Sequence, residues 1–314
     1  MQCKNNVNRG VFLENTGCGL CNRKCRVDRD NGEKGFCGET SEIRCGRAAL
    51  HMWEEPCISG TKGSGTVFFS GCGLRCCFCQ NHDIAIGSRG RAVSVERLGE
   101  IFLELKEKGA ANINLVTGAH YVPQIIEALD MARRKGLDIP VVYNSSGYEK
   151  TETLKLLEGY VDIYLPDLKY LDPELAQKFS NAPDYVQAAK AAIGEMVRQT
   201  GKCEFGEDGY IRKGTIVRHL ILPGHTGNSI KALRYLHETY GEDIYISIMN
   251  QYTPVRKFVE FKELNRKVTK REYEKVLDAA VDMGIQNGFI QEGETASESF
   301  IPDFDYEGVE KNTP

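Results

Sequence analysis

From residue 66 onward, the chain alternates between two hydrophobic patterns. Short runs of apolar and β-branched residues predict buried strands, whereas apolar residues spaced three and four apart predict amphipathic helices. Strands are predicted at residues 66–69, 111–116, 139–143, 161–165, 215–222 and 244–249. Helices are predicted at residues 94–108 and 122–135, from Asn228 or Ser229 onward, and from a capping box of Thr269 and Glu272 to about Met283.

This alternation of strands and helices predicts an α/β fold with parallel strands joined by right-handed crossovers. A further β-like run at residues 288–292 is expected to extend the sheet. We therefore divide the chain into an N-terminal segment with a linker at residues 1–60, an α/β core at 61–300 and an acidic tail at 301–314. The tail is expected to be loosely ordered.

The composition fits a protein with a large core and no strong electrostatic signature. The 314 residues are 41% hydrophobic, and 40 basic side chains nearly balance 44 acidic ones without forming a basic block. Such a charge distribution gives no indication of nucleic-acid binding. No apolar run approaches the roughly 20 residues of a membrane helix, and the N-terminus lacks the apolar segment of a secretory signal. We therefore expect a cytoplasmic protein without a membrane segment.

Twelve cysteines in such a chain predict metal ligands or free thiols instead of disulfides. Four of them form a C-x2-C-x3-C-x11-C pattern in the N-terminal segment: Cys18, Cys21, Cys25 and Cys37. This segment has little hydrophobic periodicity and cannot fold by apolar burial alone, so a bound metal is expected to stabilise it. The spacing is compatible with zinc or with an auxiliary [4Fe-4S] cluster, and Cys45 or Cys57 could replace Cys37. Unliganded thiols are the alternative.

A second cysteine motif directly follows the first predicted strand. Cys72, Cys76 and Cys79 form a C-x3-C-x2-C triplet on a predicted loop. Three thiolates this close together can ligate three irons of a cubane [4Fe-4S] cluster and leave the fourth iron open to a substrate or cofactor. Zinc would need a fourth ligand, and no cysteine pair follows closely. A C-x4-C-x-C pattern through Cys77 is the alternative, but adjacent cysteines rarely ligate one cluster, so Cys77 is interpreted as a small apolar residue.

The sequence of this loop, GCGLRCCFCQN at residues 71–81, resembles the cluster-binding loop of the radical S-adenosylmethionine (SAM) superfamily, including the aromatic Phe78 before the last cysteine. Within that superfamily the chain is most similar to pyruvate formate-lyase activating enzymes with a cysteine-rich N-terminus. The resemblance implies a partial (β/α)6 barrel and a [4Fe-4S] cluster whose open iron binds the amino and carboxylate groups of SAM. One electron from the cluster then releases a 5'-deoxyadenosyl radical, which abstracts a hydrogen atom.

The resemblance also implies partners. A reducing protein such as a flavodoxin or ferredoxin would supply the electron, and a glycyl-radical enzyme would be the protein substrate of an activating enzyme. A radical SAM enzyme acting on a small molecule remains open. Two non-catalytic hypotheses also remain open, namely an iron–sulfur electron-transfer protein and a zinc-ribbon binding module.

Residues that follow the predicted strands are expected to bind SAM, because ligands bind at the carboxyl ends of parallel strands. Thr117, Gly118 and His120 follow the second strand, where relatives often have a Gly-Gly-Glu-like turn that binds the SAM amino group. Thr117 and exposed carbonyls can take over this role, and His120 is either a ligand contact or a structural hydrogen-bonding residue. Asn144 and Ser145 follow the third strand and suit ribose or carboxylate contacts.

Charged residues complete the expected site. Asp167 and Lys169 follow the fourth strand in a segment that resembles the Asp-Leu-Lys of activating enzymes, and they can bind the amino and carboxylate groups of SAM. The alternative is a solvated pair at the rim. Arg218 lies within the apolar fifth strand, where an unpaired charge is costly, so we expect a functional partner such as the SAM carboxylate. Gln251 and Tyr252, at the end of the sixth strand, are expected to face the substrate.

Overall fold

The structure, a computed structural model, describes residues 17–291 and 302–311. These residues form one sheet of ten strands in the order β10-β9-β8-β6-β5-β4-β2-β1-β3, with β7 as a further partner of β8. Six parallel strands make its centre: β2 (Ser64–Phe69), β4 (Ile113–Val116), β5 (Val141–Ser145), β6 (Ile163–Pro166), β8 (Ile211–Leu220) and β9 (Tyr245–Met249). Within the described residues the sheet stays open, with β10 (Gly288–Ile290) and β3 (Arg91–Ala92) at its edges.

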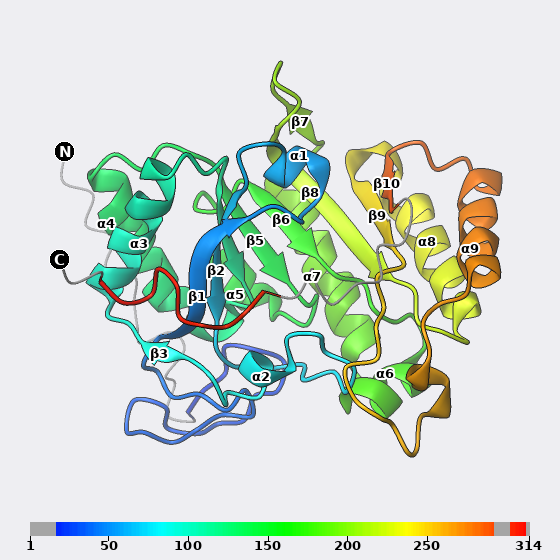
Figure 1. The fold of residues 1–314 in the computed structure, drawn as a ribbon, viewed down its shortest axis with the longest axis horizontal. Helices are drawn as coiled ribbons and strands as arrows, with labels where there is room; N and C mark the ends of the chain where they lie inside the picture. Colours follow the sequence, from blue (N-terminus) through cyan, green and yellow to red (C-terminus); the bar gives the residue numbers. More distant parts are fainter. Residues whose placement is uncertain (1–16, 292–301, 312–314) are drawn as a thin grey trace.

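Helices connect the successive parallel strands and cover the outer face of the curved sheet (Figure 1). The main ones are α3 (Val95–Glu107), α4 (Val122–Arg134), α5 (Thr151–Lys155), α6 (Pro173–Ser180), α7 (Tyr185–Thr200), α8 (Thr226–Tyr240) and α9 (Lys270–Asp282). Short elements complete the chain: α1 (Pro56–Ser59), α2 (His82–Ala85), β7 (Glu204–Phe205) and the 3-10 turns Ala119–Tyr121, Gly241–Asp243 and Lys262–Asn265.

The predicted α/β fold with an open, mostly parallel sheet is confirmed. Each predicted strand and helix is present, with its ends shifted by a few residues, because fraying ends carry little periodicity. Ser94 caps α3 by accepting a hydrogen bond from the backbone N–H of Arg97, and the predicted capping box of Thr269 and Glu272 starts α9. The predicted extension is β10; Glu292, its last expected residue, lies outside the described residues.

One long strand is not marked by the hydrophobic pattern of the sequence. β1 (Arg44–His51) lies in the segment at residues 1–60 and pairs antiparallel with β2 on one side and β3 on the other. Its sequence RCGRAALH mixes arginine, glycine and alanine, which have low strand propensity, and its burial does not alternate with a period of two. Pairing with two neighbours stabilises a strand that local preference would not predict.

The expectation of a loosely ordered C-terminal tail is wrong for residues 302–311. The backbone N–H of Tyr306 donates to the Gly46 carbonyl at 3.0 Å, and that of Ala48 donates to the Glu307 carbonyl at 2.8 Å. Val309 is only 2% exposed and belongs to the core beside α3. The segment is ordered because β1 offers it both hydrogen bonds and an apolar surface.

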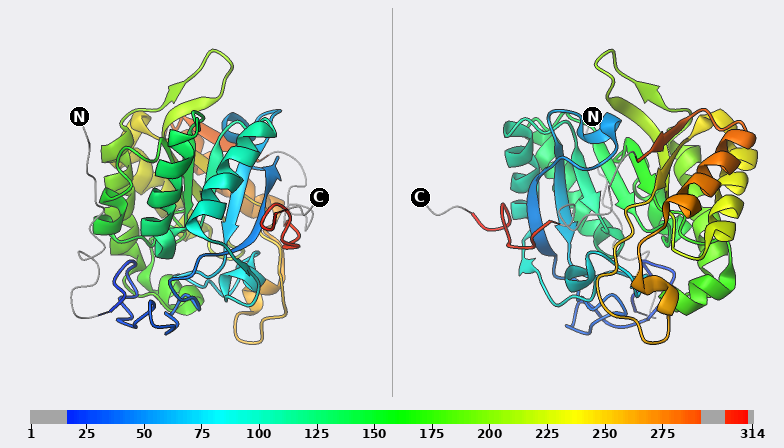
Figure 2. Two further views of the ribbon diagram at one scale, coloured as in Figure 1. Left: turned by 90° about the vertical axis from the view of Figure 1, so that its left-hand side faces the viewer. Right: turned by 45° about the vertical axis from the view of Figure 1, so that its right-hand side comes forward.

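The cysteine-rich N-terminal loops gather at the end of the molecule where α2 lies, opposite α1 (Figures 1 and 2). The loop that follows β2 leads directly to α2, so this end carries both cysteine motifs. Among the described residues, no helix combines the length and the apolar character that crossing a bilayer requires.

Candidate active site

A cavity of 390 Å3 lies inside the curved sheet and reaches the cysteine loop after β2. The residues at its cysteine end include Cys72, Cys76 and Cys79, whereas Cys77 is not among the lining residues. Cys77 packs instead against the apolar core, and its backbone N–H donates to the Phe179 carbonyl of α6 at 2.8 Å. The cavity thus brings the predicted triplet together and leaves out the cysteine that was interpreted as a packing residue.

Backbone geometry and hydrogen bonds fix the cysteine loop. Arg75 adopts a positive φ of 53° within the loop, a conformation that is uncommon for residues other than glycine. The backbone N–H of Leu74 lies 3.4 Å from Cys72 Sγ, and the Ser180 hydroxyl lies 3.2 Å from Cys76 Sγ. Both groups can donate hydrogen bonds to sulfur. Such hydrogen bonds help to set the reduction potential of iron–sulfur clusters. Phe78 is 4% exposed and anchors the loop in the core.

The donor chemistry of the triplet fits a cluster. Burial, together with the charges of Cys72 and Cys76, raises the pKa of Cys79 to about 12, although the ammonium of Lys169 opposes this effect. Three neighbouring thiols, of which Cys76 is buried and the other two are partly buried, repel one another as thiolates and need a shared cation to be ionised together. No group of three or more His, Cys, Asp or Glu side chains in the described ranges is placed to hold a single metal ion. A cubane spreads its ligands over several irons, so each of the three thiolates could bind a different iron.

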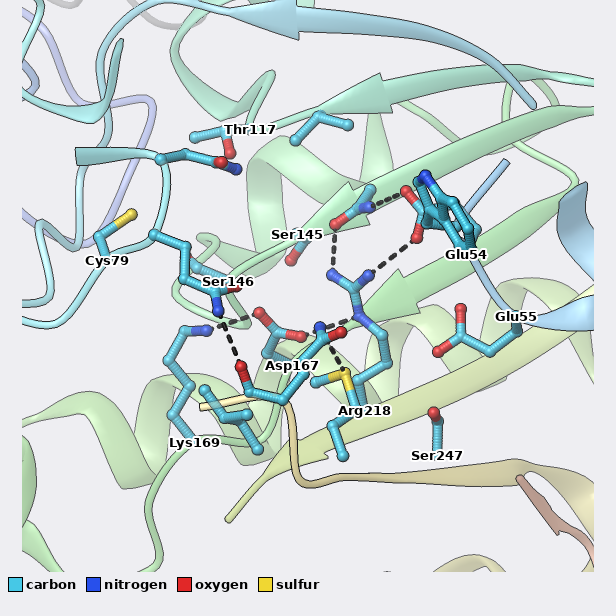
Figure 3. A pocket seen from close by; sticks show the side chains of 18 of the residues that line it. Glu54, Glu55, Cys79, Thr117, Ser145, Ser146, Asp167, Lys169, Arg218 and Ser247 are labelled. Carbon is cyan, nitrogen blue, oxygen red and sulfur yellow. Dashed lines mark hydrogen bonds and ion pairs between the residues drawn. The ribbon is translucent and has the colours of Figure 1, made fainter. Parts of the chain in front are cut away.

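A buried row of alternating charges runs along the cavity wall (Figure 3). Lys169 Nζ lies 2.6 Å from Asp167 Oδ2, and Asp167 Oδ1 accepts from Arg218 Nε at 2.9 Å. Arg218 Nη1 in turn lies 3.1 Å from Glu54 Oε2. The side chains in this row are 8–16% exposed, so the alternative of a solvated rim pair for Asp167 and Lys169 is wrong.

The row keeps its members ionised despite burial. Burial opposes the negative charge of Asp167, but Arg218 and Lys169 outweigh it and hold the pKa of Asp167 below its usual value. Burial likewise opposes the ammonium of Lys169, but Asp167 outweighs it and raises the Lys169 pKa to about 12. Lys169 therefore carries a permanent positive charge beside the cysteines, where it can bind a carboxylate.

Two acidic residues of the cavity wall, Glu54 and Glu55, lie between β1 and α1 and are not predicted from the sequence. Glu54 Oε1 accepts from Asn114 Nδ2 at 2.9 Å and from Asn144 Nδ2 at 3.2 Å. Figure 3 shows both glutamates and Ser247 at one end of the cavity, with Cys79 and Thr117 at the other. No motif marks these residues, because two adjacent glutamates in a connecting segment are usually surface residues.

Glu55 is 8% exposed, and its Oε2 atom has no hydrogen-bond partner within the described residues. Burial raises the pKa of Glu55, the charge of Glu54 adds to this effect, and the charge of Arg218 opposes it. A buried carboxyl oxygen without a partner is costly unless a bound molecule or water satisfies it. Glu55 therefore contributes to the cavity wall a carboxyl group that bonds Ser247 and keeps one oxygen without a partner in the described part of the chain.

Three further predicted residues line the cavity. Thr117 follows β4 with a positive φ of 62°, and Ser145 ends β5. Asn144 Oδ1 accepts a hydrogen bond from Arg218 Nη2 at 2.6 Å, so this amide connects β5 to the charged row. Gln251 also lines the cavity, whereas Tyr252 is not among the lining residues and donates its hydroxyl to the Leu264 carbonyl.

Gly118 and His120 do not lie in the cavity wall. The 3-10 turn Ala119–Tyr121 directs the His120 ring beneath the cysteine loop, where Nε2 lies 2.7 Å from the Ser70 carbonyl oxygen. His120 is 3% exposed, and burial lowers its pKa to about 3, so it is a neutral structural residue. Of the two hypotheses for His120, the structural one fits the geometry. The N-terminal cysteines Cys18, Cys21, Cys25 and Cys37 also lie outside the cavity wall.

Comparison with known proteins identifies a family whose matched region includes the cysteine loop. The family model described as the Radical SAM superfamily matches residues 66–236, more than half of the chain. An uncharacterized protein of Methanocaldococcus jannaschii, MJ0674, is 28% identical over 270 residues, which are 84% of this chain and 74% of that protein.

Two more distant similarities involve proteins of named function. The pyruvate formate-lyase-activating enzyme of Clostridium pasteurianum is 27% identical over 113 residues, which are 34% of this chain and 46% of that enzyme. The solved structure of HydG, a maturase of the [FeFe]-hydrogenase, superposes with a TM-score of 0.49 at 14% identity. That superposition covers 75% of this chain and about half of HydG, 53%.

Proposed function

The chain belongs to the radical SAM superfamily, and from this premise we propose that it cleaves SAM reductively at a [4Fe-4S] cluster ligated by Cys72, Cys76 and Cys79. One observation carries the ligand assignment. These three thiols line one cavity, and the adjacent Cys77 does not. When bound, the cluster supplies one electron and an open iron site for SAM.

The side chains of this protein are proposed to position SAM within the cavity. Lys169 is a permanent cation next to the cysteines and is proposed to bind the SAM carboxylate. Asp167 holds Lys169 in place, and Arg218 fixes Asp167 from the other side. Thr117, Asn144 and Ser145 offer hydrogen-bonding groups for the SAM amino group and ribose. Phe78 supports the cysteine loop from the core.

The substrate is proposed in two alternative classes. Activation of a glycyl-radical enzyme, with a protein glycine as hydrogen donor, is supported by the partial similarity to the Clostridium pasteurianum activating enzyme. A small molecule is favoured by a different observation, namely the unpartnered Glu55 oxygen at the inner end of the cavity. A buried acceptor of this kind suits a small polar substrate with a donor group.

A flavodoxin or ferredoxin is proposed as the reductant, because the reaction consumes one electron at low potential. A cytoplasmic site of action is kept as part of the proposal, and the balanced charge of the sequence gives no indication of a nucleic-acid partner. A non-catalytic electron-transfer role would leave the polar cavity beside the triplet without a use.

The experiment is anaerobic reduction of the reconstituted protein with dithionite in the presence of SAM. We expect methionine and 5'-deoxyadenosine to accumulate. Cys76→Ala should abolish both products, whereas the matched variant Cys77→Ala should retain most of the cleavage, because Cys77 does not line the cavity. Cluster absorbance without cleavage in the unmodified protein would point to the electron-transfer hypothesis instead.

A further inference from the structure

Four thiols near the N-terminus have no role in the chemistry proposed above. Cys18, Cys21, Cys25 and Cys37 are free cysteines on loops that contain almost no regular secondary structure. Cys21 is 8% exposed and Cys37 is 6% exposed, although the surrounding loops are rich in polar residues. Loops of this composition need a stabilising element other than an apolar core.

The four thiols converge on one region. A Cβ atom at Gly35 would lie 3.3 Å from both Cys25 Sγ and Cys37 Sγ, so these two sulfurs approach the glycine from either side. The backbone N–H of Lys24 donates to the Cys21 carbonyl and that of Arg26 to the Cys18 carbonyl, both at 3.1 Å. These hydrogen bonds fold residues 18–26 into one compact loop, which carries three of the four thiols.

A buried guanidinium points to a negative charge at the same place. Arg29 is 6% exposed, and no ion pair within residues 17–291 and 302–311 involves it. Its Nη1 atom donates to the His120 carbonyl at 2.6 Å and lies 4.0 Å from Cys18 Sγ, while Nε is buried without a hydrogen-bond partner. A buried cation without a carboxylate is costly unless an anion compensates it. Ionised thiolates around a metal centre would provide that anion.

The arrangement of the thiols favours one kind of metal centre over another. Zinc draws four thiolates to about 2.3 Å from one ion, and no described group of three or more potential ligands is arranged in this way. The triplet Cys72, Cys76 and Cys79 likewise forms no single-ion group in the described part of the chain. A cubane spreads its ligands over four irons, so it suits thiols that converge without reaching a single ion.

We propose that Cys18, Cys21, Cys25 and Cys37 ligate a second [4Fe-4S] cluster, closed by four protein thiolates and adjacent to the loop that carries the catalytic triplet. A Cβ atom at Gly73 would lie 3.3 Å from Cys21 Sγ, so the two cysteine motifs touch at this glycine. Arg23 connects them further, because its Nε donates to the Gly73 carbonyl at 2.7 Å and its Nη2 to the Leu74 carbonyl at 3.1 Å. The adjacency of two clusters rests on the proposed function, whereas the second cluster itself does not.

The test measures iron, sulfide and zinc in the anaerobically reconstituted full chain and in two multiple variants. We expect about eight irons in the unmodified protein and about four in each variant, because a cubane holds four. The first variant, C72A/C76A/C79A, should keep a reducible [4Fe-4S] spin signal that does not respond to SAM. The second, C18S/C21S/C25S/C37S, should keep a signal that SAM alters. Cys203→Ala serves as the control, since this half-buried cysteine lies in neither motif.

The proposal is overturned by about four irons and one zinc in the unmodified protein, or by a folded C72A/C76A/C79A protein that binds no iron. If the N-terminal variant does not fold, the iron content of the C72A/C76A/C79A protein tests the proposal by itself, because the N-terminal thiols of that protein are intact. Circular dichroism establishes that it is folded. Cleavage of SAM by the unmodified protein tests the proposed function separately, so either proposal can fail while the other stands.

Discussion

Arg218 Nε donates a hydrogen bond to Asp167 Oδ1 across 2.9 Å, and this contact lies in the middle of a row of four buried charges. Lys169 completes the row on the side of Asp167, and Glu54 completes it on the side of Arg218. Two cations thus balance two anions, which allows all four groups to stay ionised away from water. The neutral row leaves Glu55 as a further acidic residue near Arg218 in the cavity wall.

Removal of the central cation should be strongly destabilising. We expect Arg218→Ala to lower the free energy of unfolding by about 3–5 kcal/mol, because it leaves two buried carboxylates without their shared partner. The matched control is Arg212→Ala, also on β8, whose ion pair with Asp208 is exposed and should contribute less than about 1 kcal/mol. Anaerobic denaturant titration measures both. Equal losses in the two variants would contradict the buried-row interpretation.

Part of this site could be predicted from the sequence, because strand ends are marked by the hydrophobic pattern. Asp167 and Lys169 follow β6, and Arg218 stands out as a charge within the apolar β8. Glu54 could not be found in this way. It reaches the row from the segment between β1 and α1, and β1 itself lacks a strand pattern. The partner of Arg218 depends on the path of the chain in space, which local periodicity does not encode.

His120 shows that position after a strand does not decide a role. The sequence left a ligand contact and a structural hydrogen bond open, and the Ala119–Tyr121 turn directs the ring toward the Ser70 carbonyl. Its own carbonyl accepts from Arg29, so it connects the N-terminal loops to the cysteine loop. Turn geometry decides which side of a strand end a residue faces, and the spacing of residues does not reveal that geometry.

Arg23 should control how tightly the two cysteine motifs are held together. Besides the Gly73 and Leu74 carbonyls, it donates to the carbonyls of Ser180 and Asn181. We expect Arg23→Ala to cost roughly 2 kcal/mol of local stability, because hydrogen bonds from a charged donor are lost. The open state would then be populated roughly 30-fold more often.

The measurement is the rate of iron release to a chelator under anaerobic conditions. Arg23→Ala should release iron faster by an order of magnitude or more. Arg26→Ala is the control, because this arginine belongs to the same loop and its side chain is exposed. Unchanged release from Arg23→Ala would show that the two motifs are held by other contacts.

Acid should destabilise the protein through buried histidines. His219 is fully buried, and burial lowers its pKa from 6.5 to about 4, although its contact with the Leu168 carbonyl acts in the opposite direction. Between these two pKa values the unfolded chain binds more protons than the folded one. The contribution of His219 to stability is therefore complete above about pH 6.5 and is lost as the pH falls from about 6.5 to about 4. The full effect is about 3 kcal/mol.

Denaturant titrations across this pH range test the assignment. His219→Asn should flatten the decrease in stability toward acid, whereas His237→Asn, on the partly exposed face of α8, should leave it unchanged. An identical acid dependence in His219→Asn and the unmodified protein would rule out His219 as a contributor.

Arg29 should set the reduction potential of the N-terminal centre. Its guanidinium lies 4.0 Å from Cys18 Sγ and stabilises negative charge there, which favours the reduced, more negative state of a cluster. We expect Arg29→Gln to shift the midpoint potential of that cluster to more negative values by on the order of 100 mV, from Coulomb's law at an effective dielectric constant of about 20. Lys24→Gln removes an exposed charge on the same loop and should change the potential far less, because solvent screens that charge.

The measurement is a redox titration followed by electron paramagnetic resonance. It is carried out in the C72A/C76A/C79A background, which isolates the N-terminal signal. A shift in Arg29→Gln no larger than in Lys24→Gln would mean that the buried guanidinium compensates some other charge.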